Sequence, residues 1–155
     1  RIGLSTIKGL AFSLAKPAAG ISALDALAYQ FPCARGLICP MIDARKGEVY
    51  AAGYTFQNGV LNQNWPAMAV SPEHIVTGMS DACLYVGNGA RLYRDQIVEL
   101  AGSCAGFAPA GQDDIRAATV GILGAKQLSQ GQATPLSQLN PWYIRPSDAE
   151  GKLVH

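Results

Sequence analysis

The chain has 155 residues, a formal net charge of +1, and 49% hydrophobic against 15% charged residues. This length suits one domain with its own core, or a piece of a larger one. No run of Lys or Arg occurs, which argues against tight unaided binding to nucleic acid. Because charged residues average about 25% in globular domains, their shortage predicts an interior rich in small residues or a surface that a partner covers.

We expect no membrane span, because no apolar stretch approaches the roughly 20 residues that one requires, and no signal peptide. The four cysteines lack C-x-x-C spacing and lie in or beside apolar runs, at Cys33, Cys39, Cys83 and Cys104. This pattern predicts buried free thiols in a cytoplasmic protein.

The first fourteen residues predict a helix rich in small side chains. Apolar residues recur at helical spacing, at Leu4, Ile7, Ala11 and Leu14. Interior glycines cost about 1 kcal/mol each relative to Ala, and they make sense where another backbone approaches closely. Pro17 and Gly20 are expected to end this helix, and Ser22 to cap a short second one. Because the helical pattern already includes Arg1, we expect a fragment of a longer chain.

Two strands and a hairpin are predicted next. Residues 37–42 form an apolar run in which Pro40 favours an edge position or a strand start. Residues 48–56 alternate as a second strand. Asn58-Gly59 is a strong hairpin-turn signal, because both residues tolerate positive φ.

Strands and helices then alternate, which indicates the α/β class. Ser71-Pro72-Glu73 is typical of a helix start, with a capping side chain and a proline at the first position. Residues 83–86 and 104–107 predict short strands, and the apolar pattern over 92–100 predicts a helix between them.

One further helix is predicted near the end of the chain. Asp113 and Asp114 are expected to open it, because acidic residues favour a helix N-terminus. Its buried face is expected to contain Ile115, Ala118, Ile122 and Ala125. Residues 140–145 predict a final extended segment, followed by a polar, mobile tail over 147–155.

Hydrolytic and metal chemistry have few candidate residues. His74 and His155 are the two histidines, and neither G-x-S-x-G nor H-E-x-x-H occurs. We expect His74 to lie on a helix surface, and we predict no catalytic residue, no cofactor-binding residue and no metal ligand.

Gly87-Asn88-Gly89-Ala90 joins a predicted strand to a helix, where backbone N–H groups can meet an anion. The full G-x-G-x-x-G pattern is absent, because Leu92 occupies the place of its last glycine. A nucleotide site and a tight turn without a ligand are both compatible with these glycines.

The most distinctive segment is Ile42-Asp43-Ala44-Arg45-Lys46-Gly47-Glu48-Val49-Tyr50. Asp43 ends a strand and Glu48 begins the next, so both acids are placed to face the two basic residues of the turn. An ordinary charged hairpin explains this pattern equally well.

This segment closely resembles the IDARRGEVY segment of the bacterial TsaB family, also called YeaZ. Three further pieces agree in order along nearly the whole chain. Residues 1–11 are similar to the helix after that family's GSFTGLR loop, Gly87-Asn88-Gly89-Ala90 to its G-x-G-A turn, and Pro141-Trp142-Tyr143-Ile144-Arg145 to its P-x-Y-x-R terminal strand.

The resemblance implies an α/β fold of the actin-like (ASKHA, ribonuclease H-like) type, present as a fragment that lacks the opening strands of the first lobe. Residues 1–35 would end the first lobe, 36–146 would form the second, and 147–155 a flexible tail. Arg45 and Lys46 replace the Gly and Thr of a D-x-G-T-type phosphate hairpin in catalytic relatives. The resemblance therefore implies no cofactor in this chain, with ATP or ADP bound only in a full complex.

The implied function is that of a non-catalytic scaffold. TsaB pairs with TsaD, and TsaE joins them, to install threonylcarbamoyl on adenosine 37 of tRNAs that read codons beginning with A. This chain would bind tRNA only indirectly, through the complex. A homodimer is also compatible with the family. Family contacts use helices of the first lobe, which predicts an interface at Arg1, Ile2, Leu4, Ser5, Lys8, Gly9 and Phe12. The signature hairpin is marked by Asp43, Arg45, Gly47, Glu48 and Tyr50.

Two other functions are carried as alternatives. A glycoprotease-type peptidase would depend on His74. A nucleotide-binding ASKHA phosphotransferase would depend on the turn that begins at Gly87.

Overall fold

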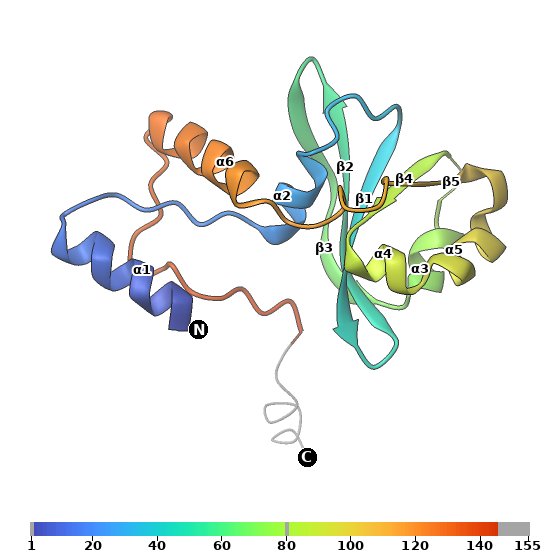
Figure 1. The fold of residues 1–155 in the computed structure, drawn as a ribbon, viewed down its shortest axis with the longest axis horizontal. Coiled ribbons are helices and arrows are strands. Elements are labelled where there is room, and N and C mark those ends of the chain that lie inside the picture. Colours follow the sequence, from blue (N-terminus) through green and yellow to red (C-terminus); the bar gives the residue numbers. More distant parts are fainter. Residues whose placement is uncertain (1, 80, 146–155) are drawn as a thin grey trace. The chain divides into compact units, whose positions relative to one another are not determined.

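A computed structural model describes residues 2–79 and 81–145 (Figure 1). Its helices are α1 (Ile2–Ser13), α2 (Ala23–Ala28), α3 (Pro72–Thr77), α4 (Asn88–Leu92), α5 (Arg94–Ala101) and α6 (Ala117–Ser129), with a 3-10 turn, η1 (Gly102–Cys104). Its strands are β1 (Leu37–Arg45), β2 (Glu48–Gln57), β3 (Val60–Val70), β4 (Cys83–Val86) and β5 (Ala105–Phe107). The α/β class is therefore confirmed.

The chain divides into two compact units. The sheet unit is formed by residues 23–116, and the helical unit by the described residues of 1–22 and 117–155. This division differs from the boundary expected near residue 35, because α6 groups with α1 instead of with the sheet. The assignment of residues 1–35 and 36–146 to two lobes stays a prediction.

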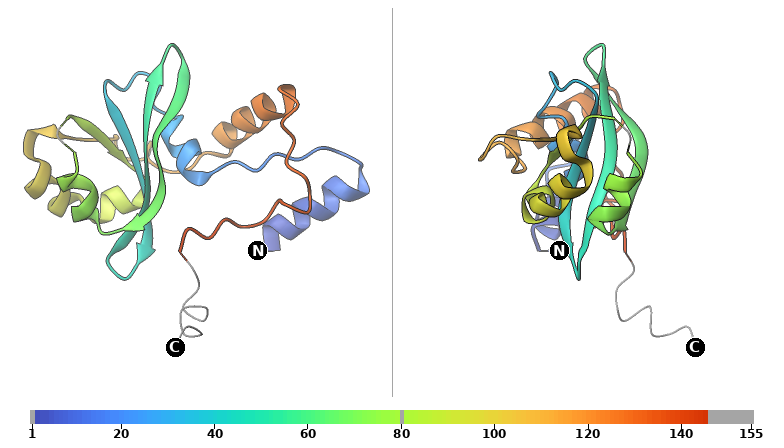
Figure 2. Two further views of the ribbon diagram at one scale, coloured as in Figure 1. Left: turned by 180° about the vertical axis from the view of Figure 1, so that it is seen from behind. Right: turned by 90° about the vertical axis from the view of Figure 1, so that its right-hand side faces the viewer.

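The sheet unit is built around five strands in the order β3-β2-β1-β4-β5. The first three form antiparallel hairpins, whereas β4 and β5 run parallel to β1. The two hairpin turns lie at opposite ends of the sheet (Figures 1 and 2). Helix α2 packs on one face, and α3, α4 and α5 cover the other (Figure 1).

The turns form where glycine and asparagine permit positive φ. The Asn58-Gly59 turn has φ of 53° and 76°, and Gln57 pairs with Val60 across it, as predicted. Ser71 caps α3 by accepting the backbone N–H of His74 at 3.3 Å, which is also as predicted.

Pro40 was expected at an edge or a strand start, and this expectation is wrong. It lies inside the central strand β1, opposite Val86 of β4. The ladder from β1 to β2 pairs Ile38 with Tyr54 and resumes at Met41, so the residue without an N–H falls between these pairs.

Helix α1 ends earlier than Pro17 and Gly20 predicted. The chain leaves the helix after Ser13, and Ala15 adopts a φ of 48°. The N–H of Lys16 then donates to the carbonyl of Ala11 at 2.9 Å, and that of Ala15 to Phe12 at 3.2 Å. This is a Schellman ending, with alanine in the place that glycine usually takes.

Helix α6 begins at Ala117, so the prediction that Asp113 and Asp114 open it is wrong. Both carboxylates instead bind Arg91 within the sheet unit. The face expected to be buried is exposed, and Thr119 is the buried residue of α6.

Three smaller expectations also change. Cys39 and Cys83 are buried, but Cys33 and Cys104 are exposed, while all four thiols are free. The helix expected over 92–100 is two helices, interrupted at Tyr93. Residues 140–145 form no strand, and the tail at 147–155 lies outside the described residues.

Close backbone packing in the sheet unit places the start of α4 against β1. A side-chain carbon on Gly87, whose φ is +99°, would meet the carbonyl oxygen of Met41. One on Gly89 would lie 2.9 Å from the carbonyl carbon of Met41. Only glycine allows this approach of helix to strand, so the two glycines are explained without a ligand.

A buried tyrosine joins α2 to the hairpin of β2 and β3. The Tyr54 hydroxyl donates to Asp25 Oδ1 at 2.5 Å and accepts from Gln63 Nε2 at 3.3 Å. Burial is the main cause that raises the pKa of Tyr54 above its ordinary value, and the Asp25 carboxylate adds to it. Burial likewise raises the pKa of Tyr85 and of the Cys39 thiol.

We predict that Gly87→Ala destabilises the chain far more than Gly102→Ala. Both glycines have positive φ, but nothing lies within 4 Å of a carbon added at Gly102. The control should therefore cost about 1 kcal/mol for the strained φ alone, whereas the clash with Met41 should add about 2 kcal/mol more. Urea unfolding measures both, and equal losses would contradict the packing account.

We also predict that the free energy of unfolding falls above about pH 9, first through Cys39 and then, above about pH 10, through the tyrosines. The raised pKa values of Tyr54, Tyr85 and Cys39 mean that the neutral forms are favoured in the folded state. Each group contributes fully to the free energy of unfolding at pH values below the pKa that it has in the unfolded chain. As the pH rises above that value, this contribution is lost, by up to about 1.4 kcal/mol per pH unit for each group. Tyr54→Phe should make the decline shallower, and an unchanged slope would show that Tyr54 does not titrate in this way.

Candidate functional site

The signature hairpin is a tight turn held by its own aspartate. Arg45, Lys46 and Gly47 have φ of 65°, 58° and 80°, and Arg45 pairs with Glu48 across the turn. Asp43 Oδ1 accepts the backbone N–H of Arg45 at 2.8 Å. The strand β1 therefore extends to Arg45, two residues beyond the expected end at Asp43.

The charges at this turn have a structural role. Arg45 Nε lies 3.9 Å from Asp43 Oδ2, and the Arg45 side chain is 87% exposed. Such an exposed pair contributes at most about 1 kcal/mol. Glu48 and Tyr50 are half-buried in β2, and Tyr50 pairs with Ile42. The side chains of Arg45 and Lys46 are thus exposed to solvent, whereas the Asp43 carboxylate binds the backbone of the turn.

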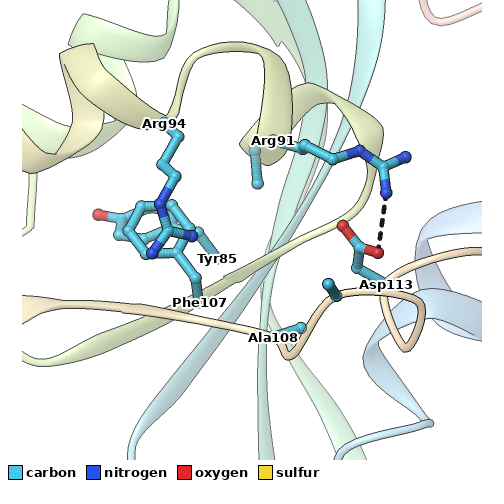
Figure 3. A pocket seen from close by; sticks show the side chains of 8 residues that line it. Tyr85, Arg91, Arg94, Phe107, Ala108 and Asp113 are labelled. Carbon is cyan, nitrogen blue, oxygen red and sulfur yellow. Dashed lines mark hydrogen bonds and ion pairs between the residues drawn. The ribbon is translucent and has the colours of Figure 1, made fainter.

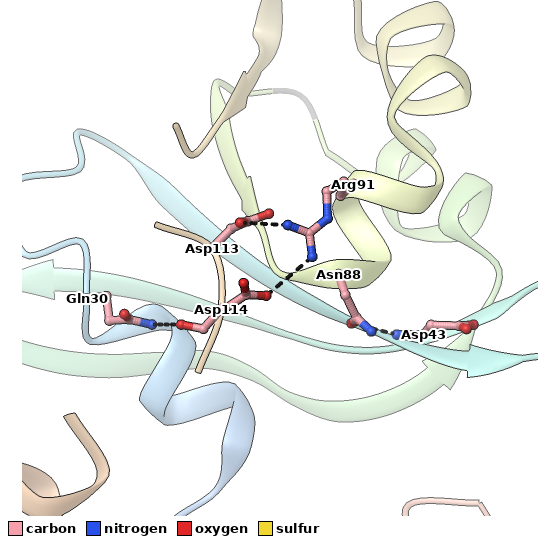
Figure 4. Close-up of polar contacts among 6 residues, drawn as sticks. All are labelled: Gln30, Asp43, Asn88, Arg91, Asp113 and Asp114. Atoms are coloured by element: carbon pink, nitrogen blue, oxygen red, sulfur yellow. Dashed lines mark hydrogen bonds and ion pairs between the residues drawn. The ribbon is translucent and has the colours of Figure 1, made fainter. Parts of the chain in front are cut away.

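The hairpin is tied to α4 through Asn88. Its side-chain Oδ1 accepts the backbone N–H of Asp43 at 3.2 Å (Figure 4). The amide of Asn88 therefore occupies the position beside Asp43, and the glycines on either side pack against β1. Close packing therefore accounts for both glycines of the Gly87-to-Ala90 turn.

The same helix holds the loop that leads toward α6. Arg91 Nη1 lies 3.1 Å from Asp113 Oδ1, and Nη2 lies 3.3 Å from Asp114 Oδ1 (Figure 4). Gln30 Nε2 donates to the backbone carbonyl of Asp114 at 3.1 Å. Sequence reasoning missed this network, because a helix start and an ion pair are equally good uses of two adjacent aspartates.

The predicted interface residues of α1 divide into two groups. Ile2 and Phe12 are 87% and 80% exposed, and Ser5 and Gly9 are also exposed. Leu4 instead packs against the small core of Ala11, Ala18 and Leu139. Lys8 Nζ donates to Asn140 Oδ1 at 3.4 Å, and Arg1 lies outside the described residues.

A second apolar surface of the helical unit was not predicted. A groove of about 570 Å³ is lined by both helices of this unit, including Ile7, Leu10 and Leu14 from α1 and Val120, Gly124 and Leu128 from α6. In the sequence, the spacing of Val120, Gly124 and Leu128 on α6 could have indicated this groove, but the same spacing equally predicts a buried helix face.

His74 is exposed on α3, as predicted, and the Ser71 hydroxyl accepts its backbone N–H. The pocket beside it is lined by Trp65, Met68, Ile75, Gly78 and Met79, none of which is Ser, Thr or Cys. Over residues 2–79 and 81–145, no three His, Cys, Asp or Glu side chains gather in a way that could hold a metal ion. His155 lies outside these ranges.

None of the helices that the structure describes is long and apolar enough to cross a membrane.

Comparison with known proteins assigns the chain to a family. Residues 1–133 match the family model described as TsaD, tRNA N6-adenosine threonylcarbamoyltransferase. The chain is 31% identical over 157 residues to the tRNA threonylcarbamoyladenosine biosynthesis protein TsaB of Bacillus subtilis, an alignment covering 99% of this chain and 67% of that relative.

Solved structures agree. A Pseudomonas aeruginosa protein described as similar to the peptidase YeaZ superposes with a TM-score of 0.73 at 23% identity, covering 94% of this chain and 67% of the other. YeaZ from the same organism gives 0.72 at 25% identity, covering 92% and 66%.

The fold is that of an actin-like, ASKHA-type α/β protein. The chain spans about two thirds of the length of these relatives. Among proteins of this class, the chain belongs to the TsaB (YeaZ) family. It is a subunit of the system that makes threonylcarbamoyladenosine in tRNA. The signature hairpin, together with three weaker pieces that agree in order, therefore predicted the family correctly.

We predict that Arg91→Met destabilises the sheet unit by about 1–3 kcal/mol, because the Asp113 carboxylate, only 10% exposed, would lose its partner. Arg116→Met is the matched control, since Arg116 is exposed and makes no ion pair in the described part of the chain. Chemical denaturation compares the two variants, and equal stability would show that the network contributes nothing.

Proposed function

We propose that the chain is a non-catalytic subunit that supports TsaD, with TsaE as a further partner, in threonylcarbamoylation of adenosine 37 of tRNAs reading codons that begin with A. The observation that carries this proposal is the exposed face of α1, where Ile2 and Phe12 stand beside Ser5 and Gly9. Exposed large apolar residues on a helix indicate a surface that a partner covers.

The small residues of this face favour a helix as the partner. Gly9 has nothing within 4 Å of the position of an added side-chain carbon, so its backbone is open to an approaching element. Apolar residues flanking a glycine allow two helices to pack closely through ridges and grooves. Lys8 and Leu4 serve the helical unit itself, so the partner surface is narrower than the sequence predicted.

The charged residues of the sheet unit support a role without chemistry. Asp43 binds the hairpin backbone, and Asp113 binds Arg91. A catalytic acid or base needs access to a substrate, and one oxygen of each of these two carboxylates is taken up by a structural partner. We infer that the chain holds no cofactor of its own, that ATP or ADP belongs to the full complex, and that tRNA is met through the complex.

We further infer that the first-lobe part, residues 1–35, presents this surface and that the second-lobe part, residues 36–146, supports it. The same face of α1 would allow a homodimer when TsaD is absent. Like the modification that it serves, the protein would act in the cytoplasm.

We predict that Gly9→Leu abolishes co-purification with TsaD, because a leucine would fill the open backbone surface. The substitution should not unfold α1, since leucine favours a helix over glycine by about 1 kcal/mol. Loss of TsaD binding with an unchanged or raised melting temperature is therefore the expected result.

Gly3→Leu is the matched control, since Gly3 lies on the same helix, has the same open surroundings and points about a third of a turn away. The interface assignment would be wrong if Gly9→Leu bound TsaD as tightly as the unmodified chain. It would also be wrong if both variants lost binding equally, because the effect would then not be specific to one face.

A further inference from the structure

A small hollow in the sheet unit is not used by the hairpin or by α1. It has a volume of about 100 Å³ and opens beside the carboxyl ends of the parallel strands β4 and β5 (Figure 3). Ligands of open α/β sheets bind at this end of the strands. The hollow is far smaller than the roughly 300–1,000 Å³ of a site for a drug-sized molecule, which excludes most cofactors.

One wall of the hollow holds a positive charge in a fixed position. The guanidinium of Arg94 lies 4.1 Å from the centre of the Phe107 ring, and that ring packs against Tyr85 at 5.9 Å between centroids (Figure 3). Stacking of this kind restrains the arginine and leaves its N–H groups at the edge free to donate. Within the part of the chain that the structure describes, Arg94 makes no ion pair.

The opposite wall holds a carboxylate that is only half used. Asp113 is 7% exposed, and its Oδ1 binds Arg91 at 3.1 Å. Its Oδ2 accepts no hydrogen bond from the described residues. A charged carboxylate oxygen that has no donor from the protein and belongs to a nearly buried side chain is a strong acceptor for a ligand.

The hollow therefore presents a donor on one side and an acceptor on the other. Three charged side chains line it, Arg91, Arg94 and Asp113, and Arg91 is already paired with Asp113 and with Asp114 outside the hollow. A simple anion would be attracted by Arg94 but repelled by the Asp113 oxygen that has no donor. A simple cation would be attracted by Asp113 but repelled by Arg94. A molecule that carries both charges satisfies both walls.

We propose that this hollow binds a small zwitterionic α-amino acid. Its carboxylate would bind the Arg94 guanidinium, and its ammonium group would donate to Asp113 Oδ2. The rest of the lining is small, with Ala90, Ala108 and Ala110, so a short side chain is selected. The donor and acceptor are both charged, which gives stronger hydrogen bonds than neutral pairs do.

The test is an NMR titration of the ¹⁵N-labelled full chain with L-alanine, L-serine and L-threonine. We expect saturable shifts at the amides of Ala90, Arg94 and Asp113, with a Kd on the order of 1 mM. Acetate, methylammonium and ADP are titrated in parallel, and each should bind at least tenfold more weakly than the amino acids.

Two variants make the assignment specific. Arg94→Met removes the carboxylate partner but leaves the Arg91–Asp113 pair in place, and Ala110→Leu fills the hollow without removing a polar group. Both should abolish the shifts, whereas Glu99→Gln, on the exposed side of α5, should preserve them. A folded spectrum of each variant separates lost binding from lost structure.

The proposal is overturned if no amino acid gives saturable shifts, or if Arg94→Met binds as the unmodified chain does. It is also overturned if acetate binds as tightly as alanine, which would define an anion site, or if ADP binds and the amino acids do not, which would define a nucleotide site. These results do not depend on binding to TsaD.

Discussion

The sheet unit depends on one close contact, the approach of α4 to the central strand. Two glycines, Gly87 and Gly89, lie against the backbone of Met41, where any side chain would clash. This approach places Asn88 beside the signature hairpin and directs Arg91 to the aspartates of the following loop. A turn that in sequence suggests a phosphate-binding loop thus lets α4 pack closely against β1.

The two units have different roles in this account. In the sheet unit, the charged side chains of the hairpin and of α4 bind partners inside that unit. In the helical unit, apolar residues such as Ile2 and Phe12 remain exposed. Burial of such side chains stabilises an assembly by about 1.5–3 kcal/mol each, so the helical unit is where association gains most. The proposed role as a binding subunit rests on this distribution of exposed apolar side chains.

Much of the sheet unit could be predicted, because its signals are local. The Asn58-Gly59 turn, the Ser71 cap and the strand periods each follow from a few adjacent residues. Asp113 and Asp114 were misplaced because their partner, Arg91, is distant in sequence, and an ion pair of that kind has no local signature. The prediction that Ile115, Ala118, Ile122 and Ala125 form a buried face failed for another reason, because the same apolar spacing occurs on buried and on exposed helix faces. The family was predictable from the signature hairpin, whereas the hollow beside Arg94 was not, because strands, helices and a loop bring its lining together.

The most direct test of the central claim is a reconstituted modification assay with TsaD, TsaE, activated threonylcarbamoyl-adenylate and unmodified tRNA. Mass spectrometry of the digested tRNA measures threonylcarbamoyladenosine at position 37, with and without this chain. The account predicts modification only when the chain and TsaD are both present, and none from the chain alone. Equal modification without the chain, or product formed by the chain in the absence of TsaD, would contradict it.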